Sequence, residues 1–215
     1  MLSDLLSWGK RSPKADPADI AAPKGEGPVV QSKAFPKFLA ALKNQPEPSL
    51  VIDFGPVIGG NVAFLGERLG CKLFIEDLVT EFDRHKKSGA AQGLPAALDA
   101  RLQQADSSVD GILCWDFFDF LDKASAQTLA RQIVRMLRPG GAVMGFFCTA
   151  PLERAPFTKF EIVGDQSLRH RHHPGIGGPK VSIPNRDIIR MFDGLVVAES
   201  FLLKNSTREI LLRKK

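Results

Sequence analysis

The sequence predicts an α/β domain with a doubly wound, mainly parallel sheet that ends in an antiparallel hairpin. Residues 50–70 read as a buried strand, a glycine-rich turn and a helix. Strand and helix patterns then alternate, which is typical of a parallel sheet with helices on both faces. Near the C-terminus, the apolar runs 195–203 and 207–213 are separated by three residues, which is hairpin spacing.

The first strand–turn–helix unit contains most of the candidate functional residues. Residues 50–54 form a short run rich in β-branched side chains, interrupted by Asp53, which predicts a strand buried on both faces. The glycines that break this pattern are Gly55, Gly59 and Gly60. Asn61 is a candidate cap of the helix that follows. Such a turn brings backbone N–H groups to a ligand, although an ordinary tight turn has the same pattern.

The other predicted elements follow from periodicity and turn residues. Helices are expected at 34–43, 78–87, 94–102, 125–137 and 184–192, and strands at 71–75, 110–115 and 142–148. Two short strands, 159–163 and 167–171, precede a Gly/Pro loop at 174–179. A further strand is expected between 75 and 110, but the only candidate, 102–105, is poor.

Composition limits the classes of protein to consider. The 215 residues carry a net charge of +5 with much of the excess at the chain ends, and no basic–aromatic stripe suggests a nucleic-acid partner. No apolar run reaches the ~20 residues of a membrane span. Three widely spaced cysteines indicate a reducing, cytoplasmic location. Residues 1–33 are expected to form a mobile tail and linker, and residues 34–215 the domain.

Several of these segments resemble class I S-adenosylmethionine-dependent methyltransferases, type 11-like. Residues 50–60 look like the family's first motif, and Glu76-Asp77 resembles the acidic end of its second strand. Residues 107–121 resemble its fourth strand and the helix after it. Met136-Leu-Arg-Pro-Gly-Gly141 and the terminal hairpin are the most specific parts. The resemblance covers about residues 36–213 and implies a Rossmann-like fold.

The resemblance also implies a site for S-adenosylmethionine. Asp53 and the turn residues Gly55, Gly59, Gly60 and Asn61 would hold the methionine end. Either Glu76 or Asp77 would accept hydrogen bonds from the ribose hydroxyls. The residues expected at the end of the fourth strand are Trp115, Asp116 and Phe117. Alternatively, Asp116 could simply cap the next helix, and Trp115 could be an ordinary core residue.

One position departs from the family pattern and keeps two functions open. Val57 stands where the family has its middle glycine. Either the turn is rebuilt around Pro56, which we favour, or the site is closed. The chain is therefore expected to methylate a small molecule. The alternative is a catalytically inactive, methyltransferase-like binding or regulatory protein.

The sequence assigns no catalytic residue and no metal ligand, because methyl transfer depends mainly on positioning. Specificity is expected in residues 149–184, which include the polar cluster Arg169-His-Arg-His-His173. That cluster could form an anion-binding patch, supply a base or bind a metal. A solvated edge strand is the reading that we favour.

Overall fold

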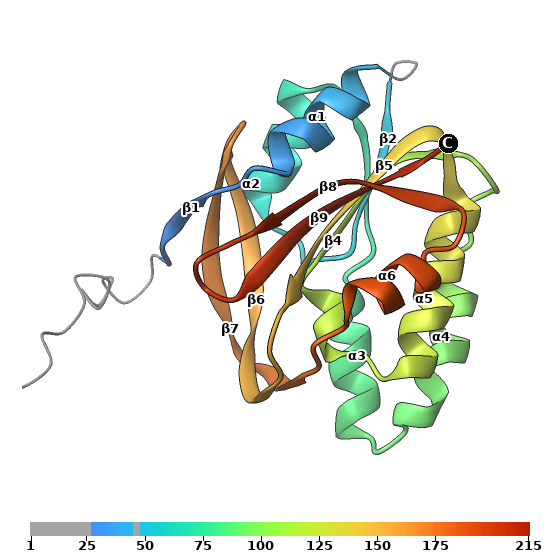
Figure 1. Ribbon diagram of the computed structural model, residues 1–215, viewed down its shortest axis with the longest axis vertical. Helices are drawn as coiled ribbons and strands as arrows, with labels where there is room; N and C mark the ends of the chain where they lie inside the picture. Colours follow the sequence, from blue (N-terminus) through green and yellow to red (C-terminus); the bar gives the residue numbers. More distant parts are fainter. Residues whose placement is uncertain (1–26, 45–47) are drawn as a thin grey trace, which may run out of the picture.

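The computed structural model describes residues 27–44 and 48–215 and contains two sheets (Figure 1). The larger sheet has the strand order β3-β2-β4-β5-β9-β8. Its strands are β2 (Leu50–Asp53), β3 (Lys72–Ile75), β4 (Val109–Trp115), β5 (Leu137–Cys148), β8 (Leu195–Leu202) and β9 (Thr207–Lys214). The pairs among β2 to β5 are parallel, whereas β9 is antiparallel to both β5 and β8. The predicted fold class, with its terminal hairpin, is therefore confirmed.

Helices and a second sheet cover the two faces of the larger sheet (Figure 1). The longer helices are α1 (Phe35–Lys43), α3 (Leu78–Lys87), α4 (Leu94–Arg101), α5 (Lys123–Met136) and α6 (Asn185–Met191). The short segments are α2 (Gly59–Val62), which continues into η2 (Ala63–Arg68), together with η3 (Ala91–Gly93) and η4 (Phe117–Phe120). One core cluster joins the sheet to α3–α6, and the other joins it to α1, η2 and the second sheet.

The second sheet is the main feature that the sequence patterns underestimated. It consists of β1 (Val29–Gln31), β7 (Ser167–Lys180) and β6 (Leu152–Gly164), in that spatial order and with antiparallel pairing. The two short strands expected here are parts of a long hairpin. The Gly/Pro loop expected at 174–179 is wrong, because this stretch continues β7 past shifts in register. Glycine and proline mark irregular pairing here rather than the end of a strand.

The N-terminal boundary of the folded part lies earlier than residue 34. Val29–Gln31 pair with Ser167–Arg169, and the Ser32 amide donates to the carbonyl of Gln166. Glu209 of β9 then accepts hydrogen bonds from the amides of Lys33 and Ala34 at 2.8 Å each, at the start of α1. A carboxylate at a helix N-terminus is stabilising. Of the tail predicted to be mobile, residues 1–33, the stretch 29–33 makes the contacts just described, and residues 1–26 lie outside the described residues.

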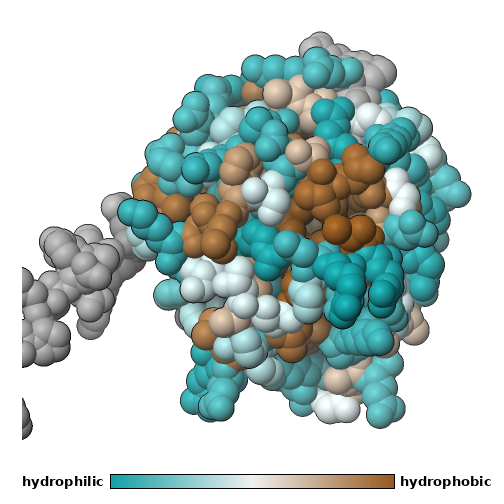
Figure 2. Space-filling view, in the orientation of Figure 1, coloured by the Kyte–Doolittle hydropathy of each residue, from teal (hydrophilic) through white to brown (hydrophobic). Residues whose placement is uncertain are grey.

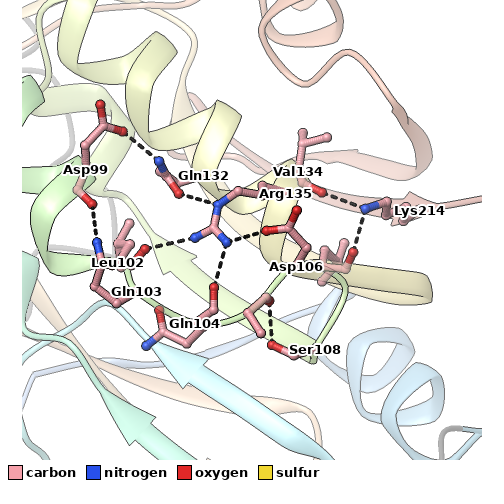
Figure 3. A network of polar contacts seen from close by, with 12 residues as sticks. Asp99, Leu102, Gln103, Gln104, Asp106, Ser108, Gln132, Val134, Arg135 and Lys214 are labelled. Atoms are coloured by element: carbon pink, nitrogen blue, oxygen red, sulfur yellow. Dashed lines mark hydrogen bonds and ion pairs between the residues drawn. The ribbon is translucent and has the colours of Figure 1, made fainter.

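Arg135 holds the segment between α4 and β4, where the expected extra strand does not form (Figure 3). Its guanidinium donates to the carbonyl groups of Leu102 and Gln104, at 2.9 and 2.7 Å, and to the Asp106 carboxylate at 2.7 Å. Gln132, one turn earlier on α5, accepts from Nε of Arg135. A side chain thus satisfies carbonyl groups that a neighbouring strand would otherwise satisfy.

The surface is mainly polar on the face in Figure 2, with an apolar area beside α6. Ile189 of α6 is 56% exposed, and Val197 of the edge strand β8 is 39% exposed. Among the described residues, no helix combines the length and apolar character required to cross a membrane.

Candidate functional site

The candidate site lies where the chain reverses its direction of travel across the larger sheet. From β2 the chain moves to β3 on one side, and it later returns to β4 on the other side. Ligands of open α/β sheets bind at such a switch point, outside the carboxyl ends of the strands. Asp53 ends β2 and Trp115 ends β4, so two predicted site residues lie together at this point.

Asp53 is buried, with 1% of its surface exposed, and donors surround its carboxylate. Oδ1 accepts hydrogen bonds from the Gly55 amide at 2.8 Å and from Nε1 of Trp115 at 2.5 Å. The Asn61 side-chain amide lies 3.4 Å from Oδ2. Loss of solvation raises the pKa of Asp53 to about 6, although these three hydrogen bonds act in the opposite direction.

Trp115 is part of the site because its side chain turns back over the glycine turn. Its backbone has a φ of +52°, a conformation that costs free energy for a bulky residue. A Cβ atom on Gly55 would lie 2.9 Å from the indole Nε1, so glycine leaves room for the indole at this position. The indole ring stacks on Phe160 of β6, with centroids 5.1 Å apart, and Phe160 stacks in turn on Phe146 of β5.

Asn61 connects the same turn to the second sheet. The prediction that Asn61 caps the helix is wrong, because the helix begins at Gly59 and the residue before it is Ile58. The Asn61 side chain donates to the carbonyl of Phe160 at 2.9 Å and accepts from the amide of Ile162 at 2.7 Å. It therefore pairs with β6 as a neighbouring strand would, and these contacts keep it inside the helix with 1% exposure.

The rest of the glycine turn is open on one side. A Cβ atom on Gly59 would meet no atom within 4 Å, whereas one on Gly60 would lie 3.2 Å from Oε1 of Glu161. Val57 is 69% exposed, so its side chain is not packed in the interior of the domain. A surface hollow of ≈ 470 Å³ adjoins Gly60 between η2 and β6.

The two acidic candidates after β3 have different environments. The Glu76 amide donates to the carbonyl of Asp53 at 2.8 Å, which places Glu76 beside the end of β2. Its carboxylate accepts hydrogen bonds from Nε of Arg101 at 3.1 Å and from the side-chain Nε2 of Gln104 at 2.8 Å. Asp77 instead caps α3 through the amide and hydroxyl of Thr80. Of the two, Glu76 has the more suitable position for a ligand.

Asp116 belongs to a buried charge cluster that the sequence did not reveal. Nζ of Lys180, from the end of β7, lies 2.7 Å from Asp116 and 3.4 Å from Asp119. Burial raises the pKa of both carboxyls, that of Asp119 to about 6, while the charge of Lys180 acts against this increase. Asp116 occupies the N-cap position of η4, as the alternative expected, but its side chain makes no capping hydrogen bond there. Phe117 is a core residue between Phe82 and Phe157.

The polar cluster at 169–173 lies in the middle strand of the second sheet rather than in a solvated edge strand. Arg169 and Arg171 both contact Glu161, at 3.4 and 2.8 Å. His170 packs edge-on against Phe160, and burial lowers its pKa to about 4. No cluster of metal-ligating side chains is present within residues 27–44 and 48–215.

Sequence reasoning missed Phe160 and Lys180 as neighbours of the site. Both belong to the β6–β7 hairpin, more than 40 residues after Trp115. In the sequence, Phe160 lies in a pattern that is typical of an ordinary strand, and Lys180 directly follows the predicted loop 174–179. No local pattern indicates their contacts with Trp115 and Asp116 at the end of β4.

Comparison with known proteins gives one family match. Residues 52–145 match the family model described as a methyltransferase domain. This stretch contains the glycine turn and the ends of β2, β3 and β4. No curated protein matches the chain in sequence.

Three solved structures with a similar arrangement are methyltransferases. The 1,6-didemethyltoxoflavin-N1-methyltransferase of Burkholderia thailandensis, with S-adenosylhomocysteine bound, is 15% identical and covers 85% of this chain and 77% of its own, with a TM-score of 0.49. An S-adenosylmethionine-dependent methyltransferase of Clostridium acetobutylicum is 13% identical, with coverages of 86% and 92% and a TM-score of 0.47. The CcbJ methyltransferase of Streptomyces caelestis is 14% identical, with coverages of 84% and 94% and a TM-score of 0.47. At these identities the likeness concerns the fold alone.

Proposed function

We propose that this chain, whose residues 52–145 match the family model of a methyltransferase domain, transfers a methyl group from S-adenosylmethionine to a small-molecule acceptor. The observation that carries the proposal is the pair of acidic residues at the switch point. Asp53 and Glu76 follow adjacent parallel strands and are joined by a backbone hydrogen bond of 2.8 Å. The glycine turn and a helix N-terminus lie between them in sequence, and their N–H groups suit the anionic carboxylate of the methionine end.

The residues at this point have the chemistry that the cofactor requires. Glu76 uses its carboxylate for two hydrogen bonds, from Arg101 and Gln104, which leaves lone pairs for ribose hydroxyls. Asp53 is a buried acceptor for the amino group of the methionine end. The open space at Gly59 allows backbone to approach a ligand closely.

The bound cofactor would supply a methyl group on a positively charged sulfur. The protein's contribution is then to position the acceptor in line with that methyl group and to exclude water. No catalytic residue is assigned. Asp116 and Asp119, at the carboxyl end of β4, are the acidic groups beyond Trp115 that could take a proton from an acceptor, with Lys180 held between them.

A specific observation also favours the alternative of a methyltransferase-like protein without catalysis. Both carboxylate oxygens of Asp53 face donors of the chain itself, and both ends of the Asn61 amide bind β6. If the chain keeps these contacts permanently, Asp53 and Asn61 are not available to the cofactor. The protein would then act through its surface, by binding a partner, rather than by catalysis at this site.

Calorimetric titration of the full chain with S-adenosylmethionine and S-adenosylhomocysteine distinguishes the two functions. We expect one molecule of either ligand to bind per chain and Glu76→Ala to weaken binding. The absence of binding of both ligands to a folded protein would support the alternative.

A further inference from the structure

We propose that Trp115 is a built-in plug of the cofactor site, and that S-adenosylmethionine binds only after the indole leaves Asp53. This inference rests on the proposed function and adds a conformational step to it. The plug is formed by residues of the described chain alone, so it is present before any ligand binds. Its existence would make the apparent affinity depend on how often the site is open.

The indole takes the same groups that a ligand with an amine would use. Its Nε1–H donates to Asp53 at 2.5 Å and lies over Gly55, where a Cβ atom would be only 2.9 Å away. A hydrogen bond from a neutral donor to a buried carboxylate is one of the stronger polar contacts in a protein. A cationic amine at Asp53 and the indole in its present position therefore compete for the same carboxylate.

The hairpin β6–β7 holds the plug in place through an aromatic stack. Phe160 is nearly parallel to the indole, with an interplanar angle of 4°, and Phe146 is nearly parallel to Phe160, with an angle of 5°. The three rings are buried, with exposures of 2–4%. The indole therefore cannot rotate away unless Phe160, and the part of β6 that carries it, also moves.

Asn61 acts as the latch of this closed arrangement. Its two hydrogen bonds, to the carbonyl of Phe160 and from the amide of Ile162, flank the residue that stacks on the plug. Glu161, between them, extends toward Gly60. The turn that would receive the cofactor therefore also holds β6 in place through Asn61. A ligand that binds the turn would compete with the Asn61 hydrogen bonds to β6 as well as with the Trp115–Asp53 hydrogen bond.

The first experiment reports the position of the plug during binding. The chain contains two tryptophans, so Trp8→Phe leaves Trp115 as the sole indole fluorophore. Binding of S-adenosylmethionine is measured by calorimetry, and the emission of Trp115 is recorded over the same titration. We expect saturation to shift the emission of this indole, which is 3% exposed without ligand, toward that of a solvated indole.

The second experiment loosens the plug without changing a residue of the cofactor site. Phe160→Leu removes the ring that stacks on Trp115 but keeps an apolar side chain in β6. Phe157→Leu is the matched control, because Phe157 lies in the same strand, is equally buried and packs on Phe117 and Phe120 instead. We expect the apparent Kd for S-adenosylmethionine to fall about tenfold for Phe160→Leu and to stay within about twofold for Phe157→Leu.

A further measurement protects the test against a folding failure of Phe160→Leu. It uses Trp8→Phe again, in which no residue of the site is changed, and records quenching of the Trp115 emission by acrylamide. The indole is 3% exposed without ligand, so we expect weak quenching in the free protein. We expect stronger quenching after saturation with S-adenosylmethionine, because the indole must leave Asp53 for the cofactor to bind.

The outcomes separate this inference from the proposed function. Binding with a shift of Trp115 emission, or binding gained by Phe160→Leu alone, supports the plug. Binding by Trp8→Phe with unchanged emission and unchanged quenching of Trp115 overturns the plug and leaves the proposed function standing. Absence of binding by every folded form, including Phe160→Leu, overturns both.

Discussion

The indole Nε1–H of Trp115 and Oδ1 of Asp53 are 2.5 Å apart and join the ends of two neighbouring parallel strands. Both residues are nearly inaccessible to solvent, with exposures of 3% and 1%. The hydrogen bond therefore compensates in part for the burial of a carboxylate that no cation contacts in the described structure. Burial nevertheless raises the pKa of Asp53 to about 6, so this acceptor is mainly charged only above that pH.

Replacing Asp53 by Asn should change how stability depends on pH. The folded pKa of about 6 lies above the ordinary value of 3.8, so the folded state binds more protons between these values. Stability from Asp53 is then complete below about pH 4 and is lost as the pH rises through 6. Relative to the wild type, Asp53→Asn should gain on the order of 2–3 kcal/mol between pH 4 and pH 7. Urea unfolding of wild type and Asp53→Asn at pH 4 and pH 7 measures this effect. A stability difference between the two proteins that is the same at both pH values would contradict it.

His170 should produce the opposite pH dependence. Burial, with smaller contributions from His172 and Lys180, lowers its pKa from 6.5 to about 4. The unfolded state therefore binds more protons between these values, and stability from His170 is present above pH 6.5 and lost as the pH falls toward 4. His170→Phe, which keeps an aromatic ring beside Phe160, should reduce the acid-induced loss by on the order of 2 kcal/mol. Unfolding midpoints of both proteins, measured as the pH falls from 7 to 4, test this. The same loss of stability in His170→Phe as in the wild type would refute it.

Arg135 should contribute far more to stability than Arg131, one turn earlier on α5. Arg135 donates to two backbone carbonyl groups and to Asp106, whereas Arg131 is 62% exposed at its side chain and contacts mainly Asp99. We expect Arg135→Gln to cost about 2 kcal/mol, because buried carbonyl groups lose their donors. Arg131→Gln should cost less than about 0.5 kcal/mol. Equal losses in chemical denaturation would show that Arg135 does not hold the segment.

Most of the larger sheet could be predicted because its elements carry local signals. The helix predicted at 78–87 coincides with α3, and the hairpin 195–213 is present nearly as expected. The second sheet could not be predicted in the same way. β1 is three residues long and gains its order from β7, far along the chain, so its sequence has no periodicity to detect. Glycines and prolines in β7 conceal a strand whose pairing contains shifts in register.

The candidate site was predictable in position but not in its contacts. Asp53 and Trp115 end strands that the pattern identifies, and Glu76 follows another, so their meeting at one edge follows from the fold class. The partners of these side chains come from distant segments, as Phe160 and Gln104 illustrate. Trp115 was expected beside the cofactor, whereas the structure shows its indole on the carboxylate that was expected to bind that cofactor.

Glu76 and Asp77 are adjacent acidic residues that should respond differently to substitution. Glu76→Ala should weaken S-adenosylmethionine binding by ~1.5–3 kcal/mol, through the loss of charge-assisted hydrogen bonds. Asp77→Ala should leave binding nearly unchanged. It should destabilise α3 by about 1 kcal/mol, because it removes the N-cap carboxylate that accepts hydrogen bonds from Thr80. Calorimetry and thermal unfolding of both variants measure the two effects separately. Weaker binding by Asp77→Ala alone would reverse the assignment of the ribose contact.

Gly59 and Val57 provide the sharpest test of the rebuilt turn. A Cβ atom on Gly59 would meet no atom within 4 Å, so we expect Gly59→Val to fold with little loss of stability. It should nevertheless abolish S-adenosylmethionine binding if the cofactor approaches the backbone there. Val57 is 69% exposed, and Val57→Gly should leave affinity nearly unchanged while lowering stability by about 0.5–1 kcal/mol through added entropy of the unfolded chain. If Val57→Gly instead creates binding that the wild type lacks, Val57 rather than Trp115 blocks the site.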